Sequence, residues 1–315
     1  MEPVAPLKKD FILITSLAEK ANVDIHPATR LGPVHYTVAD LERQLNFYQE
    51  RLGFQLNWRE GRSAGLGAGG QDLLKLTEAP GARRVRGTAG LYHTAFLLPT
   101  RLALAQVILN IAQTRTPVEG GSNHGTHLAL YLPDAEGNGI ELAWDFPRAV
   151  WEPLVAKMRS GNLQELMHVM RQPLDIEGLL DEAQRAATPW AGLPAGTTVG
   201  HVHLHVADLD ATARFYHNVL GFEMIFKMPE MAAAFFGAGG YHHHIGANLW
   251  NGPNAPPAPP YATGLRYFTI VLPNQEELDR ALRRVEQAGL AQETSDDGLL
   301  VRDPAHIGLK LTVGE

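Results

Sequence analysis

The chain contains an internal duplication, and this repeat restricts its possible folds more than any other feature of the sequence. Three short motifs occur twice in the same order, as Val38-Ala-Asp-Leu41 and Val206-Ala-Asp-Leu209, Leu52-Gly-Phe54 and Leu220-Gly-Phe222, and Gly67-Ala-Gly-Gly70 and Gly237-Ala-Gly-Gly240. Repeated segments fold into similar units that bury their apolar faces against one another. The two halves should therefore have the same architecture.

Each half contains two smaller units. Gly90-Leu91 leading to Leu98-Pro99 returns as Gly264-Leu265 leading to Leu272-Pro273. In the first unit a strand-like alternation is followed by Asp40, a suitable helix N-cap, and Gly53 comes where that helix should end. Glycine turns then separate three short strand-like runs. We predict an α+β protein built from four βαβββ modules.

The repeat also defines domain boundaries. An N-terminal arm, residues 1–31, precedes the first half, residues 32–149, which holds modules 1 and 2. Residues 150–196 form a mainly helical connector, and residues 197–315 form the second half with modules 3 and 4. A connector of this length allows the modules of the two halves to pair in more than one way.

Composition removes several functional classes. The chain has no cysteine, 14 histidines and a net charge of −7. Disulfides and thiolate chemistry are therefore excluded, and a bound metal must be held by nitrogen and oxygen. No basic cluster favours nucleic acid, and no apolar run is long enough to span a membrane. We expect a cytoplasmic protein without a signal peptide, with a homo-oligomer as one possible state.

The four-module layout resembles the vicinal oxygen chelate superfamily, which includes glyoxalases, bleomycin-resistance proteins and type I extradiol dioxygenases. Within it, the chain is most similar to two-half catechol 2,3-dioxygenases. The motifs that carry this closer resemblance are Gly90-Leu-Tyr-His93, Gly137-Asn-Gly-Ile-Glu141, Gly200-His-Val-His-Leu-His205 and Gly240-Tyr-His-His-His-Ile-Gly246. The resemblance covers nearly all of residues 32–315.

The resemblance implies metal ligands at the first and last strands of the modules. On this basis His93, Glu141 and His201 are the metal ligands, because they are the capable donors at those positions. The other such positions hold Pro33, Lys75, Tyr267, Lys310 and a residue near Ile245. Only pairing of module 2 with module 3 would unite the three ligands in one cup-shaped sheet. We therefore expect modules 1 and 4 to form a second, metal-free cup.

A further signature of type I extradiol enzymes precedes the glutamate. His124, Leu130-Tyr131, Asp134 and Gly137 take its places, while Ser122 and Ala135 depart from it. By resemblance, His124 and Tyr131 would hydrogen-bond the bound catecholate. A loop histidine and a core tyrosine are the structural alternatives.

The run Tyr241-His-His-His244 is similar to the strand that carries the acid–base histidine in extradiol enzymes. If residues 241–247 continue a strand, alternation places His243 on the cup side. We expect His243 to move protons, with His244 as the second candidate. A surface metal-scavenging tract is the alternative interpretation.

The implied activity is extradiol cleavage of a catechol-type ring with O₂ at one metal ion, Fe(II) or alternatively Mn(II). Two histidines and one carboxylate with open positions opposite are the usual ligands for this chemistry. Two alternatives remain. One is a glyoxalase-like lyase or isomerase with Zn(II) or Ni(II), which usually requires a second carboxylate. The other is a non-catalytic sequestering protein of the bleomycin-resistance type.

Overall fold

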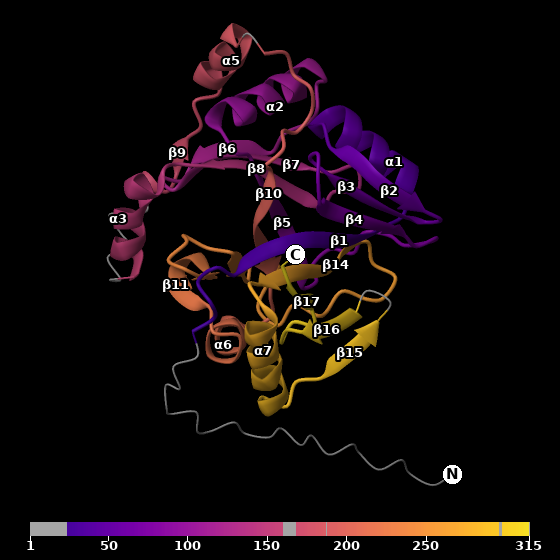
Figure 1. Cartoon of the computed structure of the whole chain (residues 1–315), viewed down its shortest axis with the longest axis vertical. Helices are drawn as coiled ribbons and strands as arrows, with labels where there is room; N and C mark the ends of the chain where they lie inside the picture. The colour runs from indigo at the N-terminus through magenta and orange to yellow at the C-terminus, as the bar shows by residue number, and fades with distance from the viewer. Residues whose placement is uncertain (1–23, 160–167, 187, 296–297, 315) are drawn as a thin grey trace.

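Two mixed β-sheets form the framework of the computed structural model, which describes residues 24–159, 168–186, 188–295 and 298–314 (Figure 1). The eight-stranded sheet has the order β15-β16-β17-β14-β1-β4-β3-β2. Its strands are β1 (Arg30–Val38), β2 (Gln55–Glu60), β3 (Ser63–Gly67), β4 (Asp72–Glu78), β14 (Gly264–Leu272), β15 (Gln292–Ser295), β16 (Gly298–Arg302) and β17 (Gly308–Val313).

The nine-stranded sheet has the order β11-β12-β13-β10-β5-β8-β7-β6-β9. Its strands are β5 (Gly90–Leu97), β6 (Gly120–Asn123), β7 (His127–Pro133), β8 (Gly139–Asp145), β9 (Gln172–Pro173), β10 (Thr198–His205), β11 (Glu223–Met228), β12 (Ala233–Gly237) and β13 (Ile245–Asn248). The α+β architecture with four repeated modules is thereby confirmed.

The module pairing expected from the sequence is also confirmed. Strand β5 of module 2 runs antiparallel to β10 of module 3, and β1 of module 1 runs antiparallel to β14 of module 4. Each sheet therefore takes one module from each half, as the neighbouring labels β1 and β14 in Figure 1 show. Antiparallel pairing of the first strands covers an edge that each module would otherwise expose.

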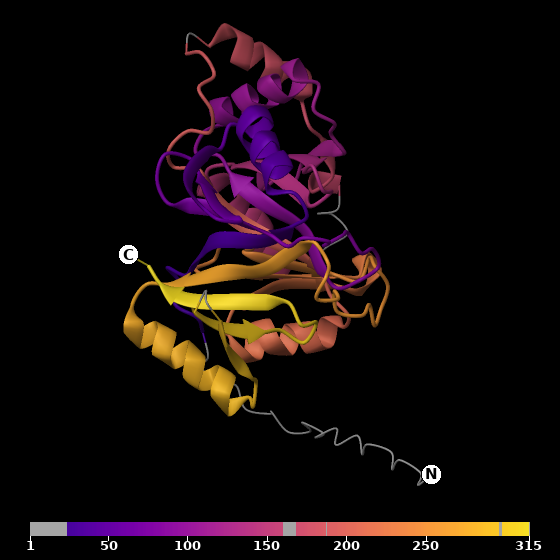
Figure 2. The same ribbon diagram turned by 90° about the vertical axis from the view of Figure 1, so that its right-hand side faces the viewer.

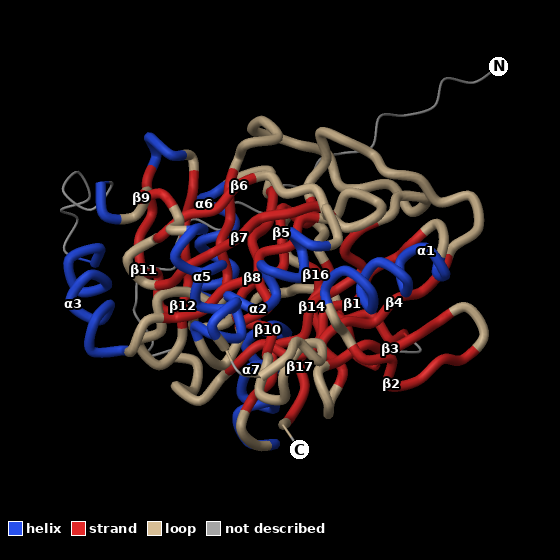
Figure 3. The backbone as a smooth tube through the Cα atoms, turned by 90° about the horizontal axis from the view of Figure 1, so that it is seen from above, coloured by secondary structure: helices blue, strands red, loops and turns tan. Residues whose placement is uncertain are grey.

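Figure 3 shows α1, α2 and α5 in front of the strands. The helical elements are α1 (Leu41–Asn46), η1 (Phe47–Arg51), α2 (Arg101–Gln113), α3 (Arg148–Arg159), α5 (Ile176–Arg185), α6 (Leu209–Ala213), η2 (Arg214–Val219), η3 (Pro229–Met231) and α7 (Gln275–Gln287). Segments η1 and η2 are π-helical, and η3 is a 3₁₀ turn. The duplicated motif thus specifies even this unusual winding.

Two of the predicted helix boundaries have the expected chemistry. The Asp40 side chain accepts a hydrogen bond from the Arg43 amide, and Asp208 caps α6 in the same way. Gly53 follows the first helix with a φ of +77°. A residue with a Cβ is strained at such a φ, so glycine suits this helix end.

Buried hydrogen bonds connect the modules within each half. The Tyr48 hydroxyl donates to Asp134 Oδ2 at 3.1 Å, and the Tyr216 hydroxyl donates to Asp303 Oδ2 at 3.0 Å. Each bond joins the helix of one module to the last hairpin of the next module in sequence. These bonds link the two sheets within each half, and β1 also contacts β10 of the other sheet and the other half. Figure 2 shows the first half above the second.

The connector is helical only in part. Helix α3 packs Trp151, Val155 and Met158 against β11 in a separate apolar cluster, and α5 packs against α2. The short strand β9 extends the second sheet, which the sequence did not predict. Residues 160–167 and 187 of the connector, and residues 1–23 of the N-terminal arm, lie outside the described residues. The described parts of the connector therefore contact module 2 through α5 and β9 and module 3 through α3.

Candidate metal and substrate site

Strands β5, β8 and β10 bring His93, Glu141 and His201 together inside the second sheet. The Nε2 atoms of His93 and His201 are 3.3 Å apart, and they lie 3.0 Å and 3.2 Å from Glu141 Oε2. All three side chains are buried. The donor atoms therefore converge on one point, although they come from both halves of the chain.

This arrangement fits a metal ion. Three ligands placed roughly 2.1 Å from an ion and at right angles to one another lie about 3 Å apart. Burial raises the pKa of Glu141, but His201, His127 and His93 outweigh it and hold this pKa well below its ordinary value. Burial lowers the pKa of His201, so its ring is neutral and offers a lone pair. An ionised carboxylate and a neutral imidazole are competent metal ligands.

His127 supports the carboxylate ligand, and the sequence analysis did not identify it. Its Nε2 lies 3.0 Å from Glu141 Oε1, the oxygen that faces away from the two ligand histidines. Its Nδ1 lies 2.8 Å from the hydroxyl of Thr126. His127 lies four residues before Tyr131 in β7, and residues an even number of positions apart lie on the same face of a strand. The position of Tyr131 would therefore have indicated His127. Such contacts orient a ligand and tune its basicity.

The structure brings the predicted substrate-binding pair together. His124 Nδ1 is 2.7 Å from the Met170 carbonyl, which only accepts, so this nitrogen carries the proton. Burial lowers the pKa of His124 to about 4, which makes the ring neutral at pH 7. Its Nε2 therefore accepts from the Tyr131 hydroxyl at 2.8 Å. Both side chains face the cavity described below.

The histidine run does not form the expected strand. Strand β13 begins at Ile245, and residues 241–244 form bends before it. The predicted strand over residues 241–244 was therefore wrong, although His243 lines the cavity as expected. His242 lines it as well. His244 is not among the lining residues; its Nδ1 accepts from the Ala238 amide at 3.2 Å.

The ring of His243 lies against a ligand histidine. Its centroid is 4.2 Å from that of His201, and His243 is 9% exposed. Burial lowers its pKa well below the ordinary value, with further lowering from His201 and His242. A neutral imidazole beside the convergence point of the ligands can accept a proton from a molecule bound there.

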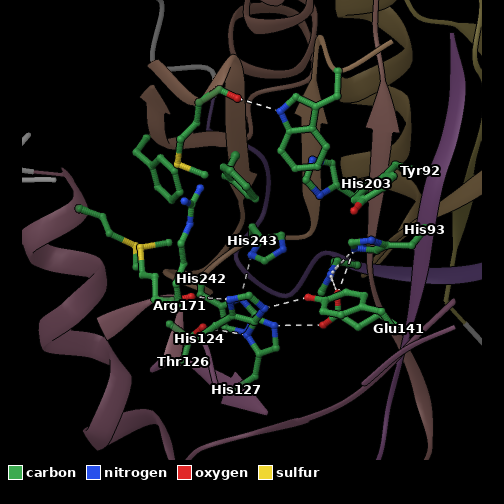
Figure 4. A pocket seen from close by; sticks show the side chains of 18 residues that line it. Tyr92, His93, His124, Thr126, His127, Glu141, Arg171, His203, His242 and His243 are labelled. Atoms are coloured by element: carbon green, nitrogen blue, oxygen red, sulfur yellow. Dashed lines mark hydrogen bonds and ion pairs between the residues drawn. The ribbon is translucent and has the colours of Figure 1, made fainter. Parts of the chain in front are cut away.

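A cavity of about 250 Å³ opens onto these groups (Figure 4). A cavity of roughly 150 Å³ is enough for benzene, so a single substituted ring has room here. Its polar wall is formed by the three ligands and by His124, His127, His203, His242 and His243. Its other walls are formed by Tyr92, Met158, Met170, Arg171, Phe226, Met231, Phe235 and Trp250. The connector contributes Met158, Met170 and Arg171, so it shapes the site from outside the repeated modules.

The first sheet presents different side chains at the equivalent positions. Gly139 in β8 lies beside His93, and Gly308 in β17 lies beside Tyr267. A Cβ atom built on either glycine would be 3.1 Å from the Cβ of its neighbour. This matching geometry makes Tyr267 the counterpart of His93 and Lys310 the counterpart of Glu141. Lys75 pairs with His35 between β4 and β1, and Gly246 pairs with His203 between β13 and β10. Gly246, and not Ile245, is therefore the counterpart of Lys75. Lys75, Tyr267 and Lys310 line a separate cavity of about 450 Å³.

Comparison with known proteins shows a relative of high sequence identity. The chain is 43% identical over 284 residues to a protein of Bacillus subtilis (strain 168) named catechol-2,3-dioxygenase, covering 89% of this chain and 95% of the relative. No helix among the described residues is long and apolar enough to cross a membrane.

Solved structures with lower identity share the fold. One is a Bacillus subtilis protein whose dioxygenase assignment is provisional, with a TM-score of 0.58, 15% identity and coverage of 92% of this chain and 85% of the other. Another is glyoxalase I from Zea mays, with a TM-score of 0.54, 16% identity and coverage of 90% and 92%. The model of the glyoxalase/bleomycin resistance protein/dioxygenase superfamily matches residues 30–142 and 198–307. The chain belongs to this superfamily, which is the vicinal oxygen chelate superfamily.

Proposed function

We propose that this protein is an extradiol dioxygenase that opens a catechol-type ring with O₂ at a single metal ion. The observation that carries the proposal is the convergence of His93, His201 and Glu141 at the wall of a cavity large enough for one ring. The similarity to a protein named catechol-2,3-dioxygenase supports the same reaction class. A cytoplasmic location is part of the proposal.

We assign Fe(II), or alternatively Mn(II), to the three ligands. Two histidines and a carboxylate on one face are the ligand set of non-haem oxygenases. When bound, the metal would supply Lewis-acid stabilisation of the catechol oxygens and a site at which O₂ could bind. The neutral state of His201 and the ionised state of Glu141 meet the requirements of such an ion.

The remaining polar groups have separate roles in this proposal. His124 and Tyr131 hydrogen-bond one catechol oxygen, and the bond between them reorganises when substrate enters. His243 accepts the second hydroxyl proton on Nε2 and returns this proton to the substrate as the ring opens; both atoms of O₂ end in the product. Histidine suits both steps because a neutral imidazole accepts a proton and the resulting imidazolium can give it back. The apolar walls position the ring and exclude water.

Two other functions have less support. A glyoxalase-like reaction usually requires a second carboxylate ligand, and Glu141 is the only acidic side chain among the described residues that line the cavity. A sequestering protein requires a cleft but no converging ligands. Neither alternative accounts for the triad together with His243.

The test combines metal analysis with turnover. Protein is purified without oxygen, its metal content is measured, and catechol is added while O₂ uptake and the yellow ring-opened product are followed. About one Fe or Mn per chain with one O₂ consumed per product supports the proposal. Zinc or nickel without O₂ uptake favours the lyase. Catechol binding without metal or turnover favours sequestration.

A further inference from the structure

Asp145, His242 and His243 form a line of hydrogen bonds that ends at the cavity. Asp145 Oδ1 lies 3.1 Å from His242 Nε2, and the Nδ1 atoms of His242 and His243 are 2.9 Å apart. Asp145 lies four residues after Glu141 in β8, on the same face of that strand. Figure 4 shows the two histidines next to each other above His127.

This line determines which nitrogen of His243 carries a proton. An ionised carboxylate only accepts, so His242 Nε2 must donate to Asp145. A neutral His242 then has an unprotonated Nδ1, which can only accept from His243 Nδ1. A neutral His243 that is protonated at Nδ1 has its lone pair on Nε2. The hydrogen bonds thereby leave Nε2 as the basic atom.

Neighbouring groups hold this arrangement in place. The Tyr241 hydroxyl donates to Asp145 Oδ2 at 2.8 Å, which occupies the second carboxylate oxygen. The ring of His127 stacks on His242 at 5.1 Å with 15° between the planes, and Trp151 meets His242 edge-on at 5.5 Å. His242 therefore has little freedom to rotate or change partners.

The charge states agree with these roles. Burial raises the pKa of Asp145, but its bonds to His242 and Tyr241 outweigh burial and lower it overall. Burial lowers the pKa of His242 to about 4. The carboxylate is therefore ionised and the imidazole neutral near pH 7.

We propose that Asp145 and His242 are positioning residues that fix the orientation and tautomer of His243, with Nε2 unprotonated and available to substrate. The inference rests on the proposed function, in which His243 is the acid–base residue. Both residues act on the reaction through His243 in this proposal. The arrangement has the same logic as a carboxylate that holds a catalytic imidazole in one tautomer in a serine protease.

The main test is Asp145→Asn in the holoenzyme. The amide oxygen of asparagine can still accept from Tyr241, while its amino group donates to His242 Nε2. His242 must then be protonated at Nδ1, and His243 must be protonated at Nε2, which removes the base. We expect kcat to fall about 10²- to 10⁴-fold, with KM and metal content nearly unchanged. The matched control is Asp72→Asn, whose carboxylate bonds Trp58 in the other sheet; it should leave kcat unchanged.

A second readout does not depend on turnover. In zinc-loaded, ¹⁵N-histidine-labelled protein, long-range ¹H–¹⁵N spectra distinguish protonated from unprotonated ring nitrogens, and His243→Gln identifies the His243 signals. Unprotonated Nε2 in the wild type and protonated Nε2 in Asp145→Asn support the inference. The same tautomer in both proteins overturns it. Absence of ring cleavage in the wild type would count against the proposed function alone, because this spectrum would still report on the tautomer.

Two substitutions of His242 give an independent measurement if Asp145→Asn does not fold. His242→Leu removes the acceptor for His243 Nδ1, whereas His242→Asn places an amide oxygen near the lost Nδ1. We expect kcat to fall about 100-fold in the leucine variant and to recover to within about tenfold of wild type in the asparagine variant. Equal loss in both folded, metal-loaded variants would overturn the inference.

Discussion

His93 and His201 point their Nε2 atoms at each other across 3.3 Å, although they belong to different halves of the duplicated sequence. They lie in adjacent antiparallel strands, β5 and β10, and Glu141 from β8 completes the group. The site therefore exists only because module 2 pairs with module 3. Pairing within each half would have left the two histidines in different sheets.

Removing a ligand should remove the metal. We expect Glu141→Gln to lower metal content from about one ion per chain to a small fraction and to reduce turnover by more than about 100-fold, because a neutral amide is a weak ligand. Metal analysis and the catechol assay measure both. Lys310→Gln changes the equivalent position of the other sheet and serves as the control. Full metal content in Glu141→Gln would contradict the ligand assignment.

Loss of the support for Glu141 should weaken metal binding without abolishing it. In His127→Phe the Oε1 atom loses its neighbour at 3.0 Å. We expect the metal dissociation constant to rise about 10- to 100-fold, as measured by competition with a chelator. His35→Phe removes a buried histidine of the other sheet that bonds Thr77, and it should not change metal affinity. Equal affinities in His127→Phe and wild type would count against the support role.

The Tyr131 hydroxyl should matter for substrate binding. We expect Tyr131→Phe to raise KM for catechol about three- to tenfold with unchanged metal content, since one buried hydrogen bond is lost. Steady-state kinetics in air-saturated buffer measure this change. Tyr36→Phe is the control, because the Tyr36 hydroxyl bonds Thr94 away from the cavity. An unchanged KM in Tyr131→Phe would remove this residue from the substrate site.

Asp303 should make stability depend on pH. Burial raises its pKa to about 6 from 3.8, although hydrogen bonds from Ile307, Tyr216 and Ala305 partly offset burial. The folded state therefore holds this proton more tightly than the unfolded state. Protonated Asp303 contributes roughly 3 kcal/mol to the free energy of unfolding. This contribution is complete below about pH 4 and is lost as the pH rises through about 6.

Asp303→Asn removes this titration while keeping a side chain that can accept the two backbone bonds. The free energy of unfolding of the variant, measured with urea, should rise relative to wild type between about pH 4 and pH 7. A constant difference between the two proteins over this range would show that Asp303 does not titrate as described. Asp210→Asn is the exposed control, and it should change stability by less than about 1 kcal/mol.

Local sequence signals were sufficient for much of the molecule. Asp40 and Gly53 mark helix ends because capping and positive φ are properties of single residues and their near neighbours. The repeat indicated four modules, and the ligand types favoured pairing 2 with 3. Local signals failed at residues 241–244, because bends before β13 interrupt the alternation from which His243 was predicted to face the cup.

Other features arise from contacts that no local pattern encodes. His127 and Asp145 join the site because β7, β8 and the bend before β13 meet in space, and neither has a sequence motif of its own. Met158, Met170 and Arg171 reach the cavity from the connector only after it folds back over the second sheet.

The sequence by itself determined the duplication, the module type and the helix caps, since these depend on residue chemistry and short spacing, while the candidate ligands followed from the family resemblance. The tertiary structure alone decided the distances between His93, Glu141 and His201, the support from His127, and the line from Asp145 to His243. The physical reason is that these relationships join strands far apart in the chain. Only the pairing of β5 with β10 and the packing around it set their geometry.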